Sequence, residues 1–411
     1  MKIYLVGGAV RDQLLGLPIK ERDWVVVGAE PQALLKLGYQ QVGRDFPVFL
    51  HPKTREEYAL ARKEKKRGSG YYGFECDANS YVTLEEDLAR RDLTINAMAM
   101  DSDGRLIDPY NGKKDLDARR LQHVSEAFVE DPVRVLRIAR FMARFEYLGF
   151  EVAAETRVFM QRMVRDGELA HLVPERVWQE WQKSLLEKNP SAFIKTLRAC
   201  GALKAILPEI DALFGVPSRV THHPEIDTGI HTLMALDMVT QLSSDPILRF
   251  ATVLHDLGKA ATPIKHWPAQ KNHDELGLPI IEQLCQRLAV PKRYQALALM
   301  VAQWHLHIHR VVELSAEKIV DIFDRTHAFR DPNDFEHMLL VCEADYRGRG
   351  ISTTKKISLD YPPAQVWRIM LAECRKLHAK TWIDQGLVGV AIKEALHAAR
   401  VACVTNIQHG N

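Results

Sequence analysis

The chain has 411 residues, and its 55 Lys and Arg residues against 53 Asp and Glu residues give a formal net charge of +2. Apolar residues make up 46% and charged residues 26%, as in ordinary soluble globular proteins. This balance excludes an extremely basic or acidic protein. It allows nucleic-acid binding, because a basic face can be balanced by acidic surface elsewhere. At about 100–200 residues per domain, the length predicts two to four domains.

The sequence lacks the patterns of a membrane or secreted protein. No run of about 18 uncharged apolar residues is present, and Arg11 and Asp12 interrupt the apolar start before a secretory leader could form. The six cysteines are scattered without a C-x-x-C pair, which is typical of reduced thiols rather than of a disulfide framework or a zinc ribbon. We therefore expect a cytoplasmic protein that does not bind a membrane.

The first part of the chain alternates strand and turn signals, and we expect strands at 2–6, 24–27, 48–50 and 58–60. The segment from Thr83 to Ala99 is typical of a helix, because Thr83 and Glu86 have the spacing of a capping box. These patterns predict a small α/β or α+β domain.

The pattern becomes helical from about residue 114. Asp131 followed by Pro132 is an N-cap with proline at the first helical position, and this helix should run to about Phe145. More helices are expected near 153–165, 174–187, 190–199 and 229–242. Before this region, five basic residues among 62–67 and the following Gly-Ser-Gly predict a mobile basic loop.

The turn after the first strand is a candidate phosphate site. Gly7 and Gly8 let backbone amides approach an anion, and the following helix start adds its dipole near Arg11. On the second strand, Glu21 and Asp23 are two residues apart, so both carboxylates should point to one face, where they could hold two metal ions. A plain tight turn and a polar strand start are the alternatives.

Four arginines of the predicted helix step by three, three and four residues, which places them on one face: Arg134, Arg137, Arg140 and Arg144. No acidic residue within this helix neutralises them. Like charges at this spacing cost roughly 0.2–0.5 kcal/mol per pair unless an anion faces them. A nucleoside triphosphate or an RNA backbone would be such an anion, and a solvated basic face is the alternative.

Histidines gather in the middle of the chain, at 222, 223, 231, 255, 305, 307 and 309. His255 and Asp256 close an apolar run, and neutral imidazole with carboxylate suits Mg, Mn, Ni or Fe better than structural zinc. A capped helix end is the alternative for this pair. The His-x-His-x-His pattern at 305–309 is equally compatible with a metal cluster and with surface histidines.

Four short motifs occur in order along the chain: Leu5-Val6-Gly7-Gly8-Ala9-Val10-Arg11-Asp12, Glu21-Arg22-Asp23, Arg90-Arg91-Asp92-Leu93-Thr94-Ile95-Asn96-Ala97 and Glu130-Asp131-Pro132-Val133-Arg134. Together they resemble the bacterial class II tRNA nucleotidyltransferases, the CCA-adding enzymes, and Arg62 to Phe74 resembles the flexible loop of that family. The resemblance covers essentially the whole chain. It implies an α+β fold, with a polymerase-beta-like α/β head followed by a mostly helical neck, body and tail.

The resemblance also implies roles for single residues. Glu21 and Asp23 would be catalytic and would bind Mg²⁺, and Asp131 with Arg134 would read the incoming base in place of a nucleic-acid template. The implied nucleotide-binding residues are Gly8, Arg11, Arg91, Asp131, Arg134, Arg137 and Arg140. The family usually has Asp where this chain has Glu21. A longer side chain displaces the carboxylate by about 1 Å, and such a displacement can cost on the order of a hundredfold in rate.

Downstream, His231, His255, Asp256 and Asp345 resemble the metal ligands of an HD phosphohydrolase domain. The resemblance implies that these residues bind Ni²⁺, Mn²⁺ or Mg²⁺, with His255 and Asp256 catalytic. In the CCA-adding family such a domain implies phosphatase, 2′-nucleotidase and 2′,3′-cyclic phosphodiesterase activities. The implied domains are a head at 1–113, a neck and body at 114–222, an HD domain at 223–330 and a tail at 331–411.

We therefore expect an enzyme that adds C, C and A to the tRNA 3′ end from CTP and ATP, acts as a monomer or homodimer, and hydrolyses phosphoesters in its HD domain. A poly(A) polymerase-like enzyme would share the head, but the HD domain and the lack of a long basic tail argue against it. An HD hydrolase with a degenerate nucleotide-binding head is favoured only by Glu21. A tRNA-binding chaperone without turnover is disfavoured by the intact Arg and Asp motifs.

Overall fold

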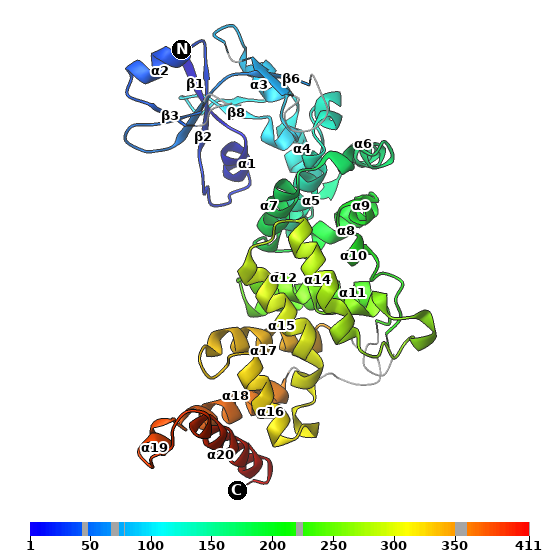
Figure 1. The fold of residues 1–411 in the computed structure, drawn as a ribbon. Coiled ribbons are helices and arrows are strands. Elements are labelled where there is room, and N and C mark those ends of the chain that lie inside the picture. Colours follow the sequence, from blue (N-terminus) through cyan, green and yellow to red (C-terminus); the bar gives the residue numbers. More distant parts are fainter. Residues whose placement is uncertain (43–47, 67–73, 78, 219–224, 350–359, 411) are drawn as a thin grey trace. The chain divides into compact units, whose positions relative to one another are not determined.

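The computed structural model describes residues 1–42, 48–66, 74–77, 79–218, 225–349 and 360–410 (Figure 1). The chain divides into two compact units, Met1–Ile206 and Leu207–Asn411. Unit 1 contains a β-sheet followed by helices, and the elements described in unit 2 are helices, so the predicted α+β class is confirmed. The finer domain boundaries given above stay predictions.

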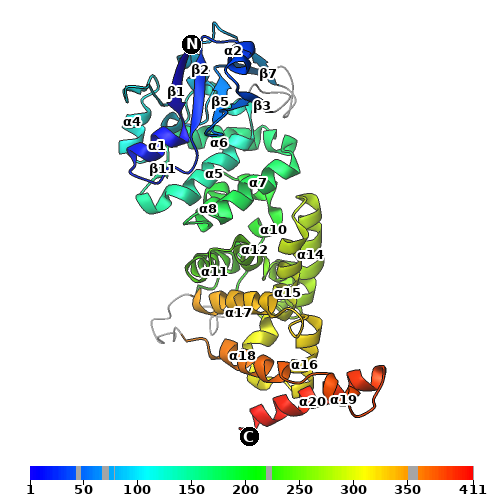
Figure 2. The ribbon, with the colours of Figure 1, turned by 90° about the vertical axis from the view of Figure 1, so that its left-hand side faces the viewer.

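Unit 1 opens with a seven-stranded sheet in the order β3-β4-β5-β2-β1-β8-β9 (Figure 2). Its strands are β1 (Lys2–Val6), β2 (Asp23–Val27), β3 (Gln40–Val42), β4 (Val48–Leu50), β5 (Glu57–Leu60), β8 (Ala99–Met100) and β9 (Leu106–Ile107). Strand β1 pairs antiparallel with β2 and β8, and β2 pairs in parallel with β5. The register places Val6 opposite Asp23. The end of β1 therefore lies beside the start of β2, and the four predicted strands are confirmed.

Successive residues of β2 pack on opposite faces of this sheet, as the two-residue period of a strand requires. Val25 lies in a buried cluster with Leu88 of α3 (Leu84–Ala89), whereas Val26 lies in a second cluster with Leu34 of α2 (Pro31–Lys36). Both faces of the central strands are therefore covered, which explains why β2 is a continuous apolar run after Asp23.

The helix predicted from Thr83 to Ala99 is wrong in length. Helix α3 spans Leu84–Ala89, and Thr83 caps it with the predicted capping box. Asp92 Oδ1 accepts hydrogen bonds from the next backbone N–H at 2.8 Å and from Asn96 Nδ2 at 3.0 Å. Such local bonds from short polar side chains compete with helix formation. Arg90, Arg91 and Asp92 consequently lie on a turn and not on the surface of a helix.

The predicted basic loop is partly strand. Strand β6 (Lys63–Lys66) lies within the predicted loop at 62–70 and pairs antiparallel with β7 (Phe74–Asp77). Residues 67–70 of that prediction lie outside the described residues.

The rest of unit 1 is mainly helical. Its helices are α1 (Gly8–Leu14), α4 (Gly112–Asp117), α5 (Val133–Phe145), α6 (Ala154–Arg165), α7 (Pro174–Leu185), α8 (Ser191–Ala199) and α9 (Ala202–Ile206), and the pair β10 (Arg120–Leu121) and β11 (Glu151–Val152) forms a small parallel sheet. The helices predicted near 132–145, 153–165, 174–187 and 190–199 are confirmed. Helix α5 buries Val135, Leu136 and Ile138 and packs against α7 and α8.

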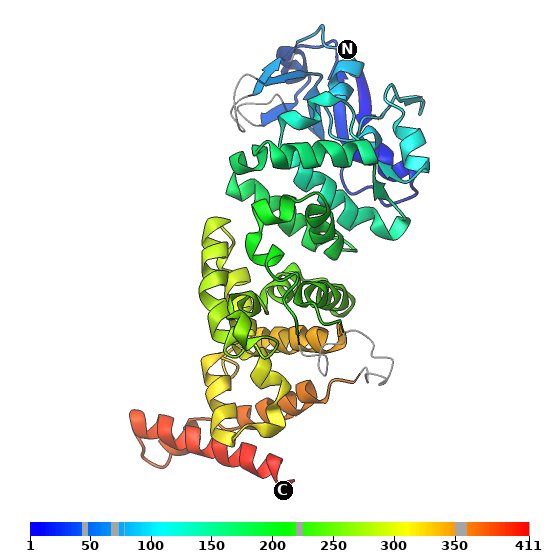
Figure 3. The same ribbon diagram turned by 90° about the vertical axis from the view of Figure 1, so that its right-hand side faces the viewer.

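The helices of unit 2 are α10 (Pro208–Asp211), α11 (Thr228–Leu242), α12 (Pro246–Leu254), α13 (Gly258–Ala261), α14 (His273–Arg287), α15 (Lys292–His309), α16 (Ala316–Arg325), α17 (Pro332–Arg347), α18 (Pro362–Arg375), α19 (Lys380–Ile383) and α20 (Val390–Gln408). The helix predicted at 229–242 is confirmed as α11. Helix α12 packs against α11, α15 and α17, and α20, drawn in red in Figure 3, packs against α16 and α18. Within the described ranges, no helix combines the length and apolar character needed to cross a bilayer.

Candidate active sites

A cavity of about 690 Å³ lies in unit 1 beside the turn that follows β1. Ten basic side chains line it against four acidic ones, so its field attracts a polyanion. All seven residues implied in nucleotide binding and both implied magnesium ligands line this one cavity. They come from the β1–α1 turn, the start of β2, the turn after α3, and α5 with its N-cap.

The turn after β1 requires glycine. Gly7 has φ of +68°, and a Cβ added there would lie 2.7 Å from Arg91 Nη1. Gly8 begins α1, and Arg11 in the same helix is buried, where it donates hydrogen bonds to Asn96 Oδ1 and to Asp12 Oδ1. The backbone thus passes close to two arginines that the surrounding structure holds in place.

Glu21 and Asp23 border the cavity where β2 begins. Asp23 is the first residue of β2, but Glu21 lies just before the strand, so the prediction that both are strand residues is correct only for Asp23. Burial raises the pKa of Asp23, Arg91 opposes this shift, and Glu21 adds to it. Carboxylate oxygens are the donors that Mg²⁺ prefers, and a cation between these two side chains would relieve their repulsion. The pair therefore fits a magnesium site.

The arginines of α5 are not left to an external anion. Three of them donate to carboxylates from other elements: Arg137 Nε to Asp92 Oδ2 at 2.7 Å, Arg140 Nε to Glu180 Oε2 at 2.6 Å, and Arg144 Nη2 to Asp12 Oδ2 at 2.7 Å. Carboxylates of the protein itself, which the sequence analysis did not consider, therefore face three of the four arginines. The pairs form through tertiary packing, which the sequence of the helix does not contain.

Asp92 is the most strongly stabilised of these carboxylates. Burial would raise its pKa, but Arg137 and Asn96 outweigh burial and hold the pKa well below its ordinary value. Asp92 thus stays ionised, and Arg137 keeps a fixed position on the cavity wall. Because a charged hydrogen bond of this kind is short and directional, the guanidinium is aimed before any ligand arrives.

The implied base-reading residues are also held by their neighbours. Arg134 donates to the backbone carbonyls of Ala127 at 2.8 Å and Arg90 at 2.6 Å. Asp131 accepts from the backbone N–H of Val133 at 3.0 Å and from Arg176 Nη2 of α7 at 3.1 Å.

Sequence reasoning missed Arg176 and Glu180, the two residues of α7 that hold Asp131 and Arg140. Their spacing of four places them on one helix face, but a mixed pair of charges on a helix most often stabilises only that helix. The sequence therefore gave no reason to connect them with α5.

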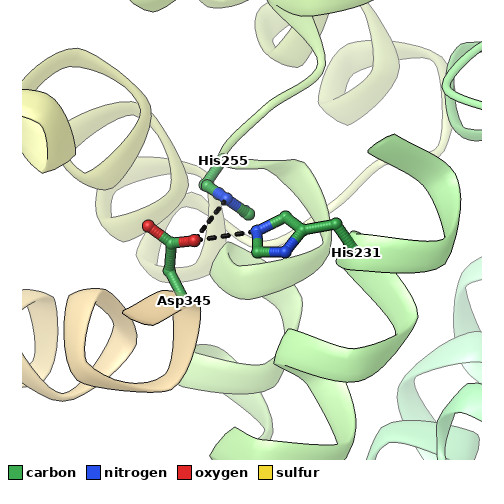
Figure 4. Close-up of side chains that lie close together, drawn as sticks. All are labelled: His231, His255 and Asp345. Atoms are coloured by element: carbon green, nitrogen blue, oxygen red, sulfur yellow. Dashed lines mark hydrogen bonds and ion pairs between the residues drawn. The ribbon is translucent and has the colours of Figure 1, made fainter. Parts of the chain in front are cut away.

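A second centre lies in unit 2, where His231 from α11, His255 at the end of α12 and Asp345 from α17 point toward one another (Figure 4). All three are buried, and their ligand atoms lie within 4.8 Å of one another. Asp345 Oδ1 is 2.8 Å from His231 Nε2 and 3.8 Å from His255 Nε2. Three helices distant in sequence thus bring three of the four implied HD ligands together.

Asp256, the fourth implied ligand, adjoins this group. Its Oδ2 lies 3.2 Å from His255 Nε2 and 2.6 Å from Lys259 Nζ. Within the described part of the chain, His255 Nε2 and Asp256 Oδ1 are buried without a hydrogen bond of good geometry. Leaving such a group unsatisfied costs about 1–3 kcal/mol, which a bound cation would recover. The donor set fits a divalent metal.

Asp256 and Asp345, the two carboxylates of this second centre, are ionised. Burial would raise the pKa of Asp256, but His255 and Lys259 hold it well below its ordinary value. Burial would also raise the pKa of Asp345, but Arg349 and His309 hold that pKa well below its ordinary value. Ionised carboxylates beside imidazoles are the form in which these side chains bind a metal.

The three histidines at 305–309, left open above between a metal cluster and surface residues, have different surroundings. His305 is buried, with Nε2 3.7 Å from Asp256 Oδ1, and His309 Nε2 lies 2.6 Å from Asp345 Oδ2. Among the described residues, His307 belongs to no group of candidate ligands. His222 and His223 lie outside the described residues.

A cavity of about 820 Å³ opens onto this centre and is lined by Asp256, His305 and Asp345 together with the basic side chains Lys259, Lys271, Arg310 and Arg349. A cavity with this lining suits a phosphorylated molecule, because the basic groups can pair with phosphate oxygens while the His and Asp groups hold a cation.

Comparisons with known proteins identify the domains in which the two sites lie. The model of the Poly A polymerase head domain matches residues 3–122, the probable RNA and SrmB-binding site of polymerase A matches 149–214, and the HD domain matches 228–328. The apo form II of a CCA-adding enzyme has a TM-score of 0.67 at 19% identity, covering 98% of this chain and 87% of that one. The Thermotoga maritima CCA-adding enzyme complexed with tRNA has a TM-score of 0.65 at 18% identity, covering 100% and 88%. These structures share the fold.

Fold and sites together define a nucleotidyltransferase that also carries an HD domain, and both kinds of domain depend on a divalent metal. The Multifunctional CCA protein of Legionella pneumophila strain Paris is 59% identical over 99% of this chain and 98% of its own length. That of Thioalkalivibrio sulfidiphilus is 55% identical over 99% of both chains. The chain belongs to the multifunctional CCA proteins, the class II CCA-adding enzymes with an HD domain.

Proposed function

We propose that this protein adds C, C and A to the 3′ end of tRNA from CTP and ATP, and that it hydrolyses phosphoesters in its HD domain. The observation that carries the first activity is the cavity of unit 1, where ten basic side chains face the Glu21 and Asp23 carboxylates. Identity of 59% to a Multifunctional CCA protein over nearly the whole chain supports it. We propose tRNA, CTP and ATP as substrates, the cytoplasm as the compartment, and a monomer or homodimer as the working state.

In the transfer step, the terminal 3′ oxygen of the tRNA forms a bond to the α-phosphorus, and the bond from that phosphorus to the bridging oxygen breaks, releasing pyrophosphate. The Gly8 backbone, Arg11 and Arg91 would hold the triphosphate, and Arg137 and Arg140 would contact the nucleotide. Glu21 and Asp23 would hold Mg²⁺, which when bound polarises the phosphate and stabilises the developing charge.

Incubation with a tRNA lacking CCA, labelled CTP and ATP, and magnesium tests this function. Addition of two C residues and one A residue supports it. A run of A residues without C would favour the poly(A) polymerase-like alternative. Hydrolysis of cyclic phosphate without nucleotide incorporation would favour an HD hydrolase with a degenerate nucleotide-binding head. Binding of tRNA without either reaction would favour a tRNA-binding chaperone.

We propose that Asp131 and Arg134 choose the base. A carboxylate accepts a hydrogen bond from the exocyclic amino group that cytosine and adenine share, whereas uracil and guanine present a carbonyl oxygen there. Arg176, which donates to Asp131 Oδ2 at 3.1 Å, would act as a positioning residue for that carboxylate.

Asp131→Ala should relax discrimination against UTP and GTP and lower the rate with CTP and ATP by about tenfold or more, because one good base contact is worth roughly 1–3 kcal/mol. Single-nucleotide incorporation onto tRNA measures this. Arg176→Ala should give a weaker form of the same change, since the carboxylate remains but loses its fixed position. Arg162→Ala, at an exposed position of α6, is the matched control. Unchanged base selection in Asp131→Ala would move the reading edge elsewhere.

Substitutions at Glu21 test how well the proposed magnesium site tolerates a Glu side chain, which is longer than Asp. Glu21→Asp should raise the transfer rate about ten- to a hundredfold if it relieves a displacement of about 1 Å, and Glu21→Gln should fall well below the parent because it removes the charge. Transfer rates at saturating magnesium decide between these cases. A fully active Glu21→Gln variant means that Glu21 is not a ligand, and an unimproved Glu21→Asp variant means that the backbone already accommodates Glu.

For the HD domain we propose hydrolysis of 2′,3′-cyclic phosphates, 2′-nucleotides and other phosphate monoesters, with Ni²⁺, Mn²⁺ or Mg²⁺ held by His231, His255, Asp256 and Asp345. A water oxygen bonds to phosphorus, the ester bond breaks, and the departing oxygen takes up a proton. The basic side chains of the 820 Å³ cavity would bind the phosphate oxygens. This activity would prepare damaged tRNA ends for the transfer site.

A further inference from the structure

The cavity of unit 2 is larger than the phosphate that its basic side chains can bind. Its volume of about 820 Å³ lies within the range of roughly 300–1,000 Å³ that is typical of pockets for drug-sized ligands. A phosphate group alone would leave most of this space unfilled. The lining also has an apolar part, which a phosphate does not use and which includes Pro268, Leu306, Leu314, Tyr346, Tyr361 and Pro363. The cavity therefore suits a molecule that joins a phosphate to a less polar group.

Two tyrosines form the aromatic part of this lining. Tyr361, the N-cap of α18, is buried, and its hydroxyl oxygen lies 2.8 Å from His309 Nδ1, so this ring is held in one orientation. Tyr346 of α17 is only partly buried, and its ring centroid lies 5.3 Å from that of Tyr361 at an interplanar angle of 38°. Because Tyr346 packs on a fixed ring and also lines the cavity, it offers an aromatic surface that needs little ordering when a ligand binds.

The charged groups beside Tyr346 follow the order of the parts of a nucleotide. The preceding residue, Asp345, is a proposed metal ligand, and Arg349 Nη2 lies 3.5 Å from its Oδ2. The guanidinium carbon of Arg349 in turn lies 5.3 Å from the centroid of the Tyr346 ring. These contacts lead from a carboxylate, through a guanidinium that can pair with phosphate oxygens, to an aromatic ring. A nucleotide likewise has a phosphate at one end and a flat base at the other.

We propose that Tyr346 stacks on the nucleobase of the substrate of the HD domain, so that this domain prefers a phosphate carried by a nucleoside to one carried by a simple alcohol. The inference rests on the phosphoester hydrolysis proposed for the HD domain, and it deepens that function by naming the substrate class. Every base has a π-face, so stacking on one ring tolerates all four bases. The alternative is that the tyrosine pair only packs the end of α17 against the start of α18.

A pair of matched substrates tests the proposal. Both 2′,3′-cyclic AMP and methyl ribofuranoside 2′,3′-cyclic phosphate carry a cyclic phosphate on ribose, but only the first has a base. With Mn²⁺ present, we expect kcat/KM to be about five- to a hundredfold higher for 2′,3′-cyclic AMP, which is the usual effect of stacking one base on an aromatic side chain. The difference should lie mainly in KM, because stacking binds the ground state and the transition state alike.

Substitutions at Tyr346 show whether this ring causes the preference. Tyr346→Leu keeps apolar bulk but removes the ring, and should reduce the preference to about twofold or less, whereas Tyr346→Phe keeps the ring and should keep the preference. Tyr147→Leu is the matched control, because Tyr147 is a surface tyrosine of unit 1 whose ring centroid lies 4.2 Å from Lys188 Nζ. Damage to the metal ligands would lower hydrolysis of both substrates alike, so the ratio of the two separates stacking from a structural role.

A parent protein that hydrolyses both substrates with equal efficiency, or a Tyr346→Leu variant that keeps the preference, overturns the stacking role and leaves helix packing as the explanation. Hydrolysis of neither substrate would refute the proposed HD activity, and binding would then decide on Tyr346. Equilibrium dialysis uses labelled guanosine 2′-monophosphate, with excess CTP to fill the cavity of unit 1. Binding should weaken about five- to a hundredfold in Tyr346→Leu and persist in Tyr346→Phe. Absence of such binding, or equal binding by Tyr346→Leu, overturns the proposal.

Discussion

Replacing Asp23 with Asn should lower nucleotidyl transfer by about a thousandfold or more and leave HD hydrolysis within about twofold of the parent. A catalytic metal supplies several kcal/mol of transition-state stabilisation, and about 4 kcal/mol corresponds to a thousandfold in rate. Asn keeps the size of Asp23 but removes the charge that would hold Mg²⁺ beside the Gly7–Gly8 turn. Labelled CMP incorporation into a tRNA lacking CCA measures the loss.

The selectivity of this effect is as informative as its size. Asp103→Ala, at an exposed turn position of the same unit, is the matched control and should transfer normally. Hydrolysis of 2′,3′-cyclic AMP should persist because all HD ligands belong to Leu207–Asn411, a separate compact unit. A fully active Asp23→Asn variant would place the magnesium site elsewhere in the cavity.

The complementary result is expected for Asp256→Asn, which should reduce metal-dependent hydrolysis of 2′,3′-cyclic AMP by about a thousandfold or more while CCA addition continues. His255→Ala should behave in the same way. The isosteric Asn is preferred to Ala because Lys259 pairs with Asp256 at 2.6 Å and is itself buried. Removing the whole side chain would leave a buried charge unpaired, at a cost of about 3–5 kcal/mol of folding stability.

Asp321→Ala serves as the control for this variant, since Asp321 forms surface ion pairs with Arg325 and Lys318 in the same unit. Loss of both activities in a folded Asp256→Asn protein would contradict two independent sites. Retention of hydrolysis would show that Asp256 is no ligand.

The parts of the fold that depend on local chemistry were predictable. Asp131 and Pro132 predicted the start of α5 to within one residue, since Pro132 and not Asp131 is its N-cap. Thr83 with Glu86 predicted the cap of α3, because caps involve residues only a few positions apart. The end of α3 was not predictable, since it depends on the way Asp92 bonds to its own neighbours instead of continuing the helix.

The residues of the candidate sites fall into the same two groups: those that a local motif identifies and those that depend on packing between distant elements. The motifs identified residues such as Arg137 and Asp256, which line the two cavities. Their partners could not be predicted: Asp92 is 45 positions from Arg137 in the sequence, and His309 is 36 positions from Asp345. Such contacts depend on packing between distant elements, and a single sequence with no fold contains no distance between them.

The carboxylates that hold the arginines of α5 also affect the entropy of binding. An arginine side chain carries about 2 kcal/mol of rotamer entropy, and here most of that loss occurs during folding, when Arg137, Arg140 and Arg144 pair with the protein. A nucleotide therefore meets side chains that need little further ordering. The same rigidity means that these three arginines offer one fixed arrangement to every incoming nucleotide. Any difference between a step that adds C and a step that adds A must come from groups other than these three arginines.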